Sequence, residues 1–248
     1  MKNLTTKLSL AAALSIALGT VGAPVAHAAE AAAVHTVTGN IALTSDYRYR
    51  GLTQSRFEPA LQGGADYTHT PTGLYAGVWA STIKWVKDAG GDTNVEIDLY
   101  GGKRGEFGGG ISYDAGVLYY AYPSNGFSDS ANTLEIYGQL GYGPGYIKYS
   151  HATTNLFGTA DSKGSGYLDI GANVELATGL VLNLHAGHQR VENYSALSYS
   201  DYKVGVTKDF GFMSVALAAV KANTDVFVTP QGKNMGKSGV VLTISKTF

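Results

Sequence analysis

The 248-residue chain contains no cysteine, and only 15% of its residues are charged. The missing cysteines exclude a disulfide framework and a thiolate metal site. No long apolar run follows the first 28 residues, so we expect no transmembrane helix in the rest of the chain. Without residues 1–28 the chain has 16 Lys and Arg against 19 Asp and Glu, a formal charge of −3. Nothing in this balance indicates a nucleic-acid partner.

The first 28 residues have the pattern of a secretory signal peptide. Lys2 and Lys7 precede an apolar segment that runs from Leu8 to about Leu18, and Ala26-His27-Ala28 is a small-x-small cleavage site. An anchoring helix is less favoured, because the apolar segment is short and runs into glycine and proline. We therefore predict a signal peptide at 1–28, cleaved near Ala28, and one domain at 29–248.

Glycine and tyrosine are abundant, with 33 and 17 residues. Many glycines and aromatics with weak alternation of apolar and polar residues are typical of β-barrels. Most of the alternating segments are 10–12 residues long, about the length of a tilted strand that crosses a bilayer. Twelve such segments lie near 36–50, 58–69, 73–84, 93–103, 107–121, 133–142, 145–151, 166–176, 179–189, 201–210, 212–222 and 238–248.

Alternation divides each strand into two faces that meet different surroundings. In the first segment, Ile41 and Leu43 share one face with Tyr47 and Tyr49, and the other face has charged residues. The segments 73–84 and 212–222 are apolar on both faces, so their orientation stays open. A charge on a lipid-facing side would cost about 2–4 kcal/mol at the bilayer midplane, so we expect the charged face to look into a lumen.

The connections alternate between tight turns and long polar loops. We expect turns at "HTPTG", "RGE", "GYGPG", "ATG" and "DFG", with longer polar segments between them. Short turns at one end and long loops at the other are typical of an outer-membrane barrel. The sequence thus predicts an all-β, transmembrane, antiparallel up-and-down barrel of about twelve strands. Its short turns would be periplasmic and its longer loops extracellular.

A soluble sandwich or lipocalin-like barrel would alternate equally well, with the apolar side chains inside. Aromatic residues at both ends of the apolar face favour the membrane barrel, because they are typical of membrane–water interfaces. The predicted outer ring is Tyr47, Tyr49, Tyr119, Tyr149 and Tyr202, and the predicted inner ring is Tyr67, Phe107, Tyr142, Phe210 and Phe248.

The last segment, "VVLTISKTF", has an apolar row that ends at Phe248. It resembles the C-terminal signature by which bacterial outer-membrane proteins are recognised for insertion. We therefore expect outer-membrane lipid and the outer-membrane assembly machinery as partners, the latter through this strand.

Several blocks resemble the TorF-type porin family of proteobacteria, a conserved hypothetical group. They are "SDYRYRGLTQS", "EPALQGGADYTH", "GLYAGVWAS", "NVEIDLYGGKRGEFGGGISYDAGVLYYAYP", "NVELATGLVLNLHAGHQ" and "DYKVGVTKDFG", in the order of the chain. The resemblance covers essentially all of the chain after the signal peptide. It implies an outer-membrane barrel that acts as a channel, and it carries over no binding residue.

Ten acidic and four basic side chains fall on the predicted lumen face, which implies a negative field that enriches cations. If these charges instead pair across the interior, they would seal it, and a twelve-stranded barrel allows either arrangement. The tentative lumen residues are Asp46, Arg48, Arg50, Asp66, Glu96, Asp98, Asp114, Glu135, Lys148, Asp169, Glu175, His185 and Lys203, together with Asp201 and Asp209.

Arg48 and Arg50 lie near the predicted outer mouth, beside Asp46. They could form the basic side of a constriction that contacts solutes, or ion-paired scaffolding that holds the first loop. His185 and His188 fall on opposite faces of one strand, so they do not share a metal ion. No serine motif accompanies His188, which disfavours a lipase-like catalytic pair, and "GEFGGG" is turn chemistry, not a phosphate loop.

We therefore predict a passive channel for small hydrophilic solutes, with no catalysis, metal or cofactor. The alternative is a closed structural or interaction barrel whose long loops bind partners.

Overall fold

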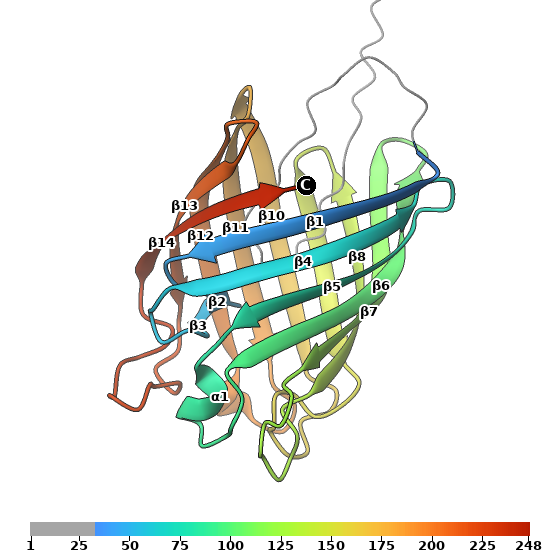
Figure 1. Ribbon diagram of the computed structural model, residues 1–248. Helices are drawn as coiled ribbons and strands as arrows, with labels where there is room; N and C mark the ends of the chain where they lie inside the picture. The colour runs from blue at the N-terminus through green and yellow to red at the C-terminus, as the bar shows by residue number, and fades with distance from the viewer. Residues whose placement is uncertain (1–32) are drawn as a thin grey trace, which may run out of the picture.

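Residues 33–248 of the computed structural model form a closed, antiparallel β-barrel (Figure 1). Twelve strands make the wall, each paired with its neighbours along the chain, and β1 pairs with β14 to close it. The predicted signal peptide at 1–28 lies outside the described residues. The wall strands are β1 (His35–Thr44), β4 (Ala60–His69), β5 (Leu74–Thr82), β6 (Val95–Phe107), β7 (Ile111–Ala121), β8 (Thr133–Tyr142), β9 (Gly145–Ala152), β10 (Gly166–Ala177), β11 (Leu180–Arg190), β12 (Tyr199–Asp209), β13 (Ser214–Ala222) and β14 (Gly239–Thr247). The predicted twelve-stranded barrel is confirmed.

Two further strands, β2 (Arg48–Tyr49) and β3 (Leu52–Thr53), form a small hairpin of their own within the first loop. The helix α1 (Trp85–Asp88) and the 3-10 helix η1 (Ser195–Leu197) lie in other long loops. Within residues 33–248, no helix has both the length and the apolar character needed to cross a membrane.

The loops differ in length at the two ends of the barrel, as predicted. Five short turns follow β4, β6, β8, β10 and β12, and the end of β14 lies on the same side. Six long connections, together with α1, lie at the opposite end, which is the lower end of Figure 1. We call these the short-turn end and the long-loop end.

Alternation gives the wall an apolar outer face and a polar inner face. On β1, Ile41 and Leu43 are exposed on the outside, whereas the intervening Ala42 and Thr44 are buried. The same pattern orients β5, whose sequence is apolar on both sides: Tyr75, Trp79 and Ser81 point inward and are buried. On β13, Leu217 is exposed on the outer face. A continuous belt of exposed apolar side chains is typical of a surface that contacts lipid.

Most of the aromatic side chains that we predicted for the outer and inner rings lie on this outer face. Tyr149 and Tyr202 are exposed toward the long-loop end, and Tyr142, Phe210 and Phe248 are exposed toward the short-turn end.

The prediction for Tyr47 and Tyr49 was wrong. Tyr47 is buried inside the barrel, and Tyr49 contacts the inward-facing Tyr120. The wall strand ends at Thr44, and alternation assigns a face only while the chain remains in the wall.

The predicted turn at "RGE" was also wrong. Strand β6 continues to Phe107, and the turn lies at Gly108–Gly110, where Gly109 and Gly110 have φ near +80°. Arg104 therefore belongs to the strand. It faces inward, donates to Thr68 at 3.0 Å and lies over the ring of Tyr75.

A substitution at Gly73, in the turn between β4 and β5, can show how tightly the short-turn end is packed. Its φ is +69°, and an added Cβ would lie 1.9 Å from the carbonyl oxygen of Arg104. We expect Gly73→Ala to lower the free energy of unfolding in lipid vesicles by at least 1–2 kcal/mol, about the cost of a left-handed residue alone. Urea titration followed by heat-modifiable gel mobility measures this change.

Gly108→Ala is the matched control, because a Cβ there meets nothing within 4 Å and its φ is outside the left-handed region. Equal unfolding free energies for the two variants would contradict the described turn.

Candidate functional site in the barrel lumen

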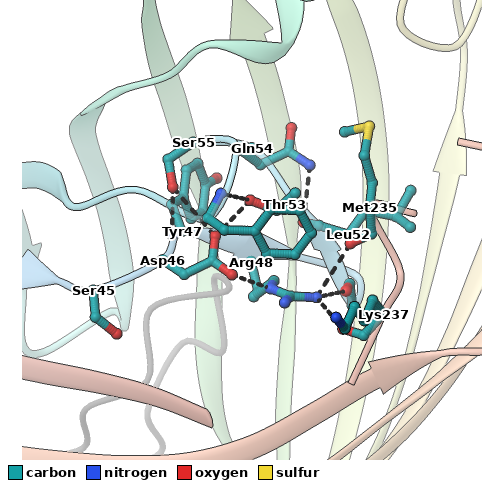
Figure 2. Close-up of polar contacts among 12 residues, drawn as sticks. Ser45, Asp46, Tyr47, Arg48, Leu52, Thr53, Gln54, Ser55, Met235 and Lys237 are labelled. Atoms are coloured by element: carbon teal, nitrogen blue, oxygen red, sulfur yellow. Dashed lines mark hydrogen bonds and ion pairs between the residues drawn. The ribbon is translucent and has the colours of Figure 1, made fainter. Parts of the chain in front are cut away.

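The first loop, residues 45–59, turns into the barrel at the long-loop end. Arg50 and Gly51 both have positive φ and connect β2 to β3, the geometry that two-residue hairpin turns need. Asp46 holds this hairpin in place. Its carboxylate accepts hydrogen bonds from Arg48 Nε and Thr53 Oγ1, each at 2.5 Å (Figure 2).

The tip of this hairpin crosses the lumen and binds the opposite wall. Both carboxylate oxygens of Glu135 on β8 accept from Arg50, at 2.7 and 2.9 Å, and Gln189 on β11 accepts at 2.5 Å. The guanidinium also lies over the ring of Tyr167 on β10. Burial opposes the charge of Arg50, but Glu135 outweighs it, so the pKa of Arg50 lies well above its usual value. Arg50 therefore stays charged and anchors the loop to the far wall.

Arg48 ties the same loop to the last one. Its guanidinium donates to the carbonyl oxygens of Gly51, Met235 and Lys237 at 2.9–3.2 Å (Figure 2). Both predicted arginines thus form ion pairs that hold the first loop in place, and Arg48 adds hydrogen bonds to backbone carbonyl groups.

Glu96 anchors the first loop through phenol groups. Its two oxygens accept from Tyr47 and Tyr122, each at 2.6 Å, and its side chain is almost fully buried. Burial and the nearby carboxylate raise the pKa of Tyr47 and of Tyr122, so both remain neutral donors.

A second charged group lies on β10–β12. His185 is bracketed by Asp169, 2.8 Å from its Nδ1, and Asp201, 2.7 Å from its Nε2. Tyr167 also donates to Asp201 at 2.8 Å. Lys203 lies directly opposite His185 in the register of β11 and β12. This wall therefore mixes basic and acidic groups in close contact.

The remaining predicted residues meet tyrosines or solvent. Asp66 accepts from Tyr100 at 2.6 Å and Asp114 from Tyr75 at 2.5 Å. The ammonium of Lys148 lies 4.1 Å from the ring centre of Tyr137. Glu175 is exposed near the short-turn end, and Asp209 lies at the end of β12.

Sequence reasoning missed the inward-facing tyrosines and Arg104. A signal was present for some of the tyrosines, because they face glycines across the sheet: Gly77 faces Tyr100, Gly116 faces Tyr137, and Gly171 faces Tyr146. A Cβ at Gly77 would meet the Tyr100 ring at 2.4 Å. For Arg104 the signal was its position on the strand. It is an even number of residues from Glu96 and Asp98, so alternation places it on the same inward face.

His188 is on the outer face, as expected, and the structure places Ser200 beside it, with 2.9 Å between Nδ1 and Oγ. The absence of a serine motif near His188 in the sequence therefore did not exclude a serine–histidine contact in the folded barrel. The hydrogen bonds described in residues 33–248 give this imidazole no carboxylate partner. In the same residues, no three metal-binding side chains are grouped to hold an ion.

The first loop and the walls line a lumen cavity of about 200 Å³. Asp98, Trp79 and Tyr120 line it on one side, and Lys148 and Lys203 on the other. A polar interior with charged groups on opposing walls can bind and orient small polar solutes.

The chain belongs to the family described as "Bacterial protein of unknown function (Gcw_chp)", whose model matches residues 28–248. That description does not include the TorF-type name, so the resemblance to TorF-type porins stays a prediction. No curated protein matches the chain.

The solved structures with a similar fold include two porins. The KdgM porin has a TM-score of 0.55 at 4% identity, over 86% of this chain and 98% of that one. The NanC porin in a rhombohedral crystal form has a TM-score of 0.54 at 10% identity, over 86% and 99%. At such identities the likeness is one of fold.

The ion pair of Arg50 and Glu135 generates a prediction about the first loop. Arg50→Met leaves the Glu135 carboxylate buried without its cation, a change that typically costs about 3–5 kcal/mol. We expect the first loop to leave the lumen and to be cleaved faster by trypsin at Arg48 or Arg56. Cleavage of the folded barrel, followed by mass spectrometry, measures this change.

Arg50→Met combined with Glu135→Leu should recover much of the resistance, because neither charge is then left alone. Arg190→Met is the control, since the Arg190–Glu192 pair is largely exposed. Unchanged cleavage in the single variant would show that the ion pair does not hold the loop.

Proposed function

We propose that this protein is an outer-membrane channel for the passive diffusion of small hydrophilic solutes. The observation that carries the proposal is the pairing of an apolar outer belt with a charged lumen in one closed barrel. The outer belt suits lipid, and the lumen offers polar groups to a solute. The fold shared with two porins supports the same proposal.

We further propose that the channel prefers cations. Acidic side chains outnumber basic ones on the inner face, even with Arg104 added to the predicted bases. An excess of one sign in a low-dielectric passage enriches ions of the opposite sign. Export through the signal peptide at 1–28 and assembly through the strand ending at Phe248 belong to the same proposal.

The rival function is a closed structural or interaction barrel whose long loops bind partners. One observation favours it: the first loop occupies the mouth and is anchored to β6, β8 and β11. Conductance separates the two functions.

The first test measures current in planar bilayers. We expect the wild-type barrel to conduct, with a reversal potential in a salt gradient that indicates a cation preference. The preference should fall at high salt, because the Debye length shrinks from about 10 Å at 0.1 M to about 3 Å at 1 M. Replacing the hairpin residues 48–53 with a short Gly-Ser link should raise the conductance, since the hairpin fills part of the mouth.

A correctly folded barrel that conducts in neither form would support the closed barrel. An anion preference would show that the basic groups on β9–β12 control passage despite their smaller number.

The second test concerns orientation in the cell. The chain has no cysteine of its own, so single cysteines can be labelled without a background. Lys163→Cys and Gln231→Cys lie in exposed parts of long loops, and we expect an impermeant maleimide to label them on intact cells. Thr178→Cys, in a short turn, is the matched control and should react only after the outer membrane is broken. The reverse pattern would overturn the proposed orientation.

A further inference from the structure

Asp98 is a buried carboxylate whose Oδ1 has no hydrogen-bond partner among residues 33–248. It is on the inner face of β6, only 1% exposed, and lines the lumen cavity. In the sheet register it faces Trp79 on β5 and Tyr120 on β7. The indole Nε1 of Trp79 is likewise buried without a partner. Buried polar groups are normally satisfied, so an unsatisfied carboxylate oxygen beside a cavity points to a bound molecule that brings a positive charge or a hydrogen-bond donor.

The surroundings of Asp98 have an excess of negative charge. Glu96 precedes it by two residues on the same inner face, and its hydrogen bonds come from Tyr47 and Tyr122. Glu135, on β8, is the one of these three carboxylates that pairs with an arginine, Arg50. An ionised carboxylate buried without a counter-charge is costly, so this wall favours a cation that enters from the lumen.

Several other groups that line the cavity with Asp98 are aromatic or apolar. Tyr47 packs edge-to-face on Trp79 at a centroid distance of 5.5 Å, and Leu118 and Tyr120 line the same cavity. Aromatic faces attract ammonium groups, and tryptophan does so best. A hard metal ion would instead need six or more oxygen ligands. A carboxylate among aromatic rings therefore selects an organic cation over a metal ion.

We propose that Asp98, with Trp79, Tyr47 and Tyr120, forms a binding site for small organic ammonium cations in the lumen. The ammonium group lies against the Asp98 carboxylate and the ring faces, and its alkyl groups contact Leu118. The site rests on the proposed channel function for its supply of solute, and it names the solute class as small amines and quaternary ammonium compounds. The cavity of about 200 Å³ has room for a small organic cation.

Tryptophan fluorescence tests this site directly. The chain has two tryptophans, Trp79 and Trp85, so Trp85→Phe leaves Trp79 as the only tryptophan, which is excited selectively at a wavelength where tyrosine does not absorb. The folded barrel in detergent is titrated with choline chloride, with sodium chloride at equal ionic strength, and with 3,3-dimethyl-1-butanol. The alcohol has the shape of choline without its charge. We expect a saturable emission change with choline, an affinity at least tenfold lower for the alcohol, and no saturation with sodium.

Asp98→Asn in the same background should weaken choline binding at least tenfold. Glu106→Gln, an exposed acid further along β6, is the matched control and should leave the affinity unchanged. Equal responses to choline and sodium, equal affinities for choline and the alcohol, or undiminished binding in Asp98→Asn would each overturn the site. If Asp98→Asn does not fold, the comparison of the three probes on the unaltered Asp98 decides alone.

The outcome is separable from that of the channel proposal. Conductance without saturable choline binding contradicts the site and leaves the channel standing. Saturable choline binding in a barrel that carries no current contradicts the channel and leaves the site standing.

Discussion

The hydrogen-bonded ladder that closes between β1 and β14 is the constraint on which the rest of the structure depends. A closed ladder pairs the backbone of every wall strand, so no strand edge is left open. It also fixes the direction of each side chain, because a shift of one residue would exchange the two faces. Leu43 therefore points outward and Thr44 inward, and the same alternation around the wall separates an apolar exterior from a lumen with charged groups.

Closure also explains where sequence reasoning succeeded. The number of wall strands and the contrast between short turns and long loops follow from local alternation and turn residues, and both were predicted correctly. Prediction failed where the chain left the wall. Tyr47 and Tyr49 continue the odd-numbered series of Ile41 and Leu43, but the ladder ends at Thr44 and these rings turn inward. Arg104 was missed because three glycines after Phe107, not the residues around Arg104, make the turn.

In the candidate site, too, the features set by neighbouring residues were predictable, and those set by distant residues were not. Alternation placed Glu96, Asp98 and Glu135 on the inner face, which needs only the parity of each strand. Their partners could not be predicted, because they come from distant parts of the chain. Arg50 pairs with Glu135 across 85 positions, and Tyr47 donates to Glu96 across 49. Such pairs depend on how a loop folds into the lumen, and no short-range pattern encodes that path.

The first loop makes the two walls of the lumen chemically different. Arg50 pairs with Glu135 and contacts Gln189 and Tyr167, so its positive charge lies against the wall formed by β8–β11. The side of β5–β7 receives Tyr47 from the same loop, a phenol that caps Glu96 but brings no positive charge. One wall therefore has carboxylates among aromatic rings, and the other has Lys148, Lys203 and His185 among carboxylates. A solute between them experiences a field across the lumen, and its own charge distribution decides how it is oriented there.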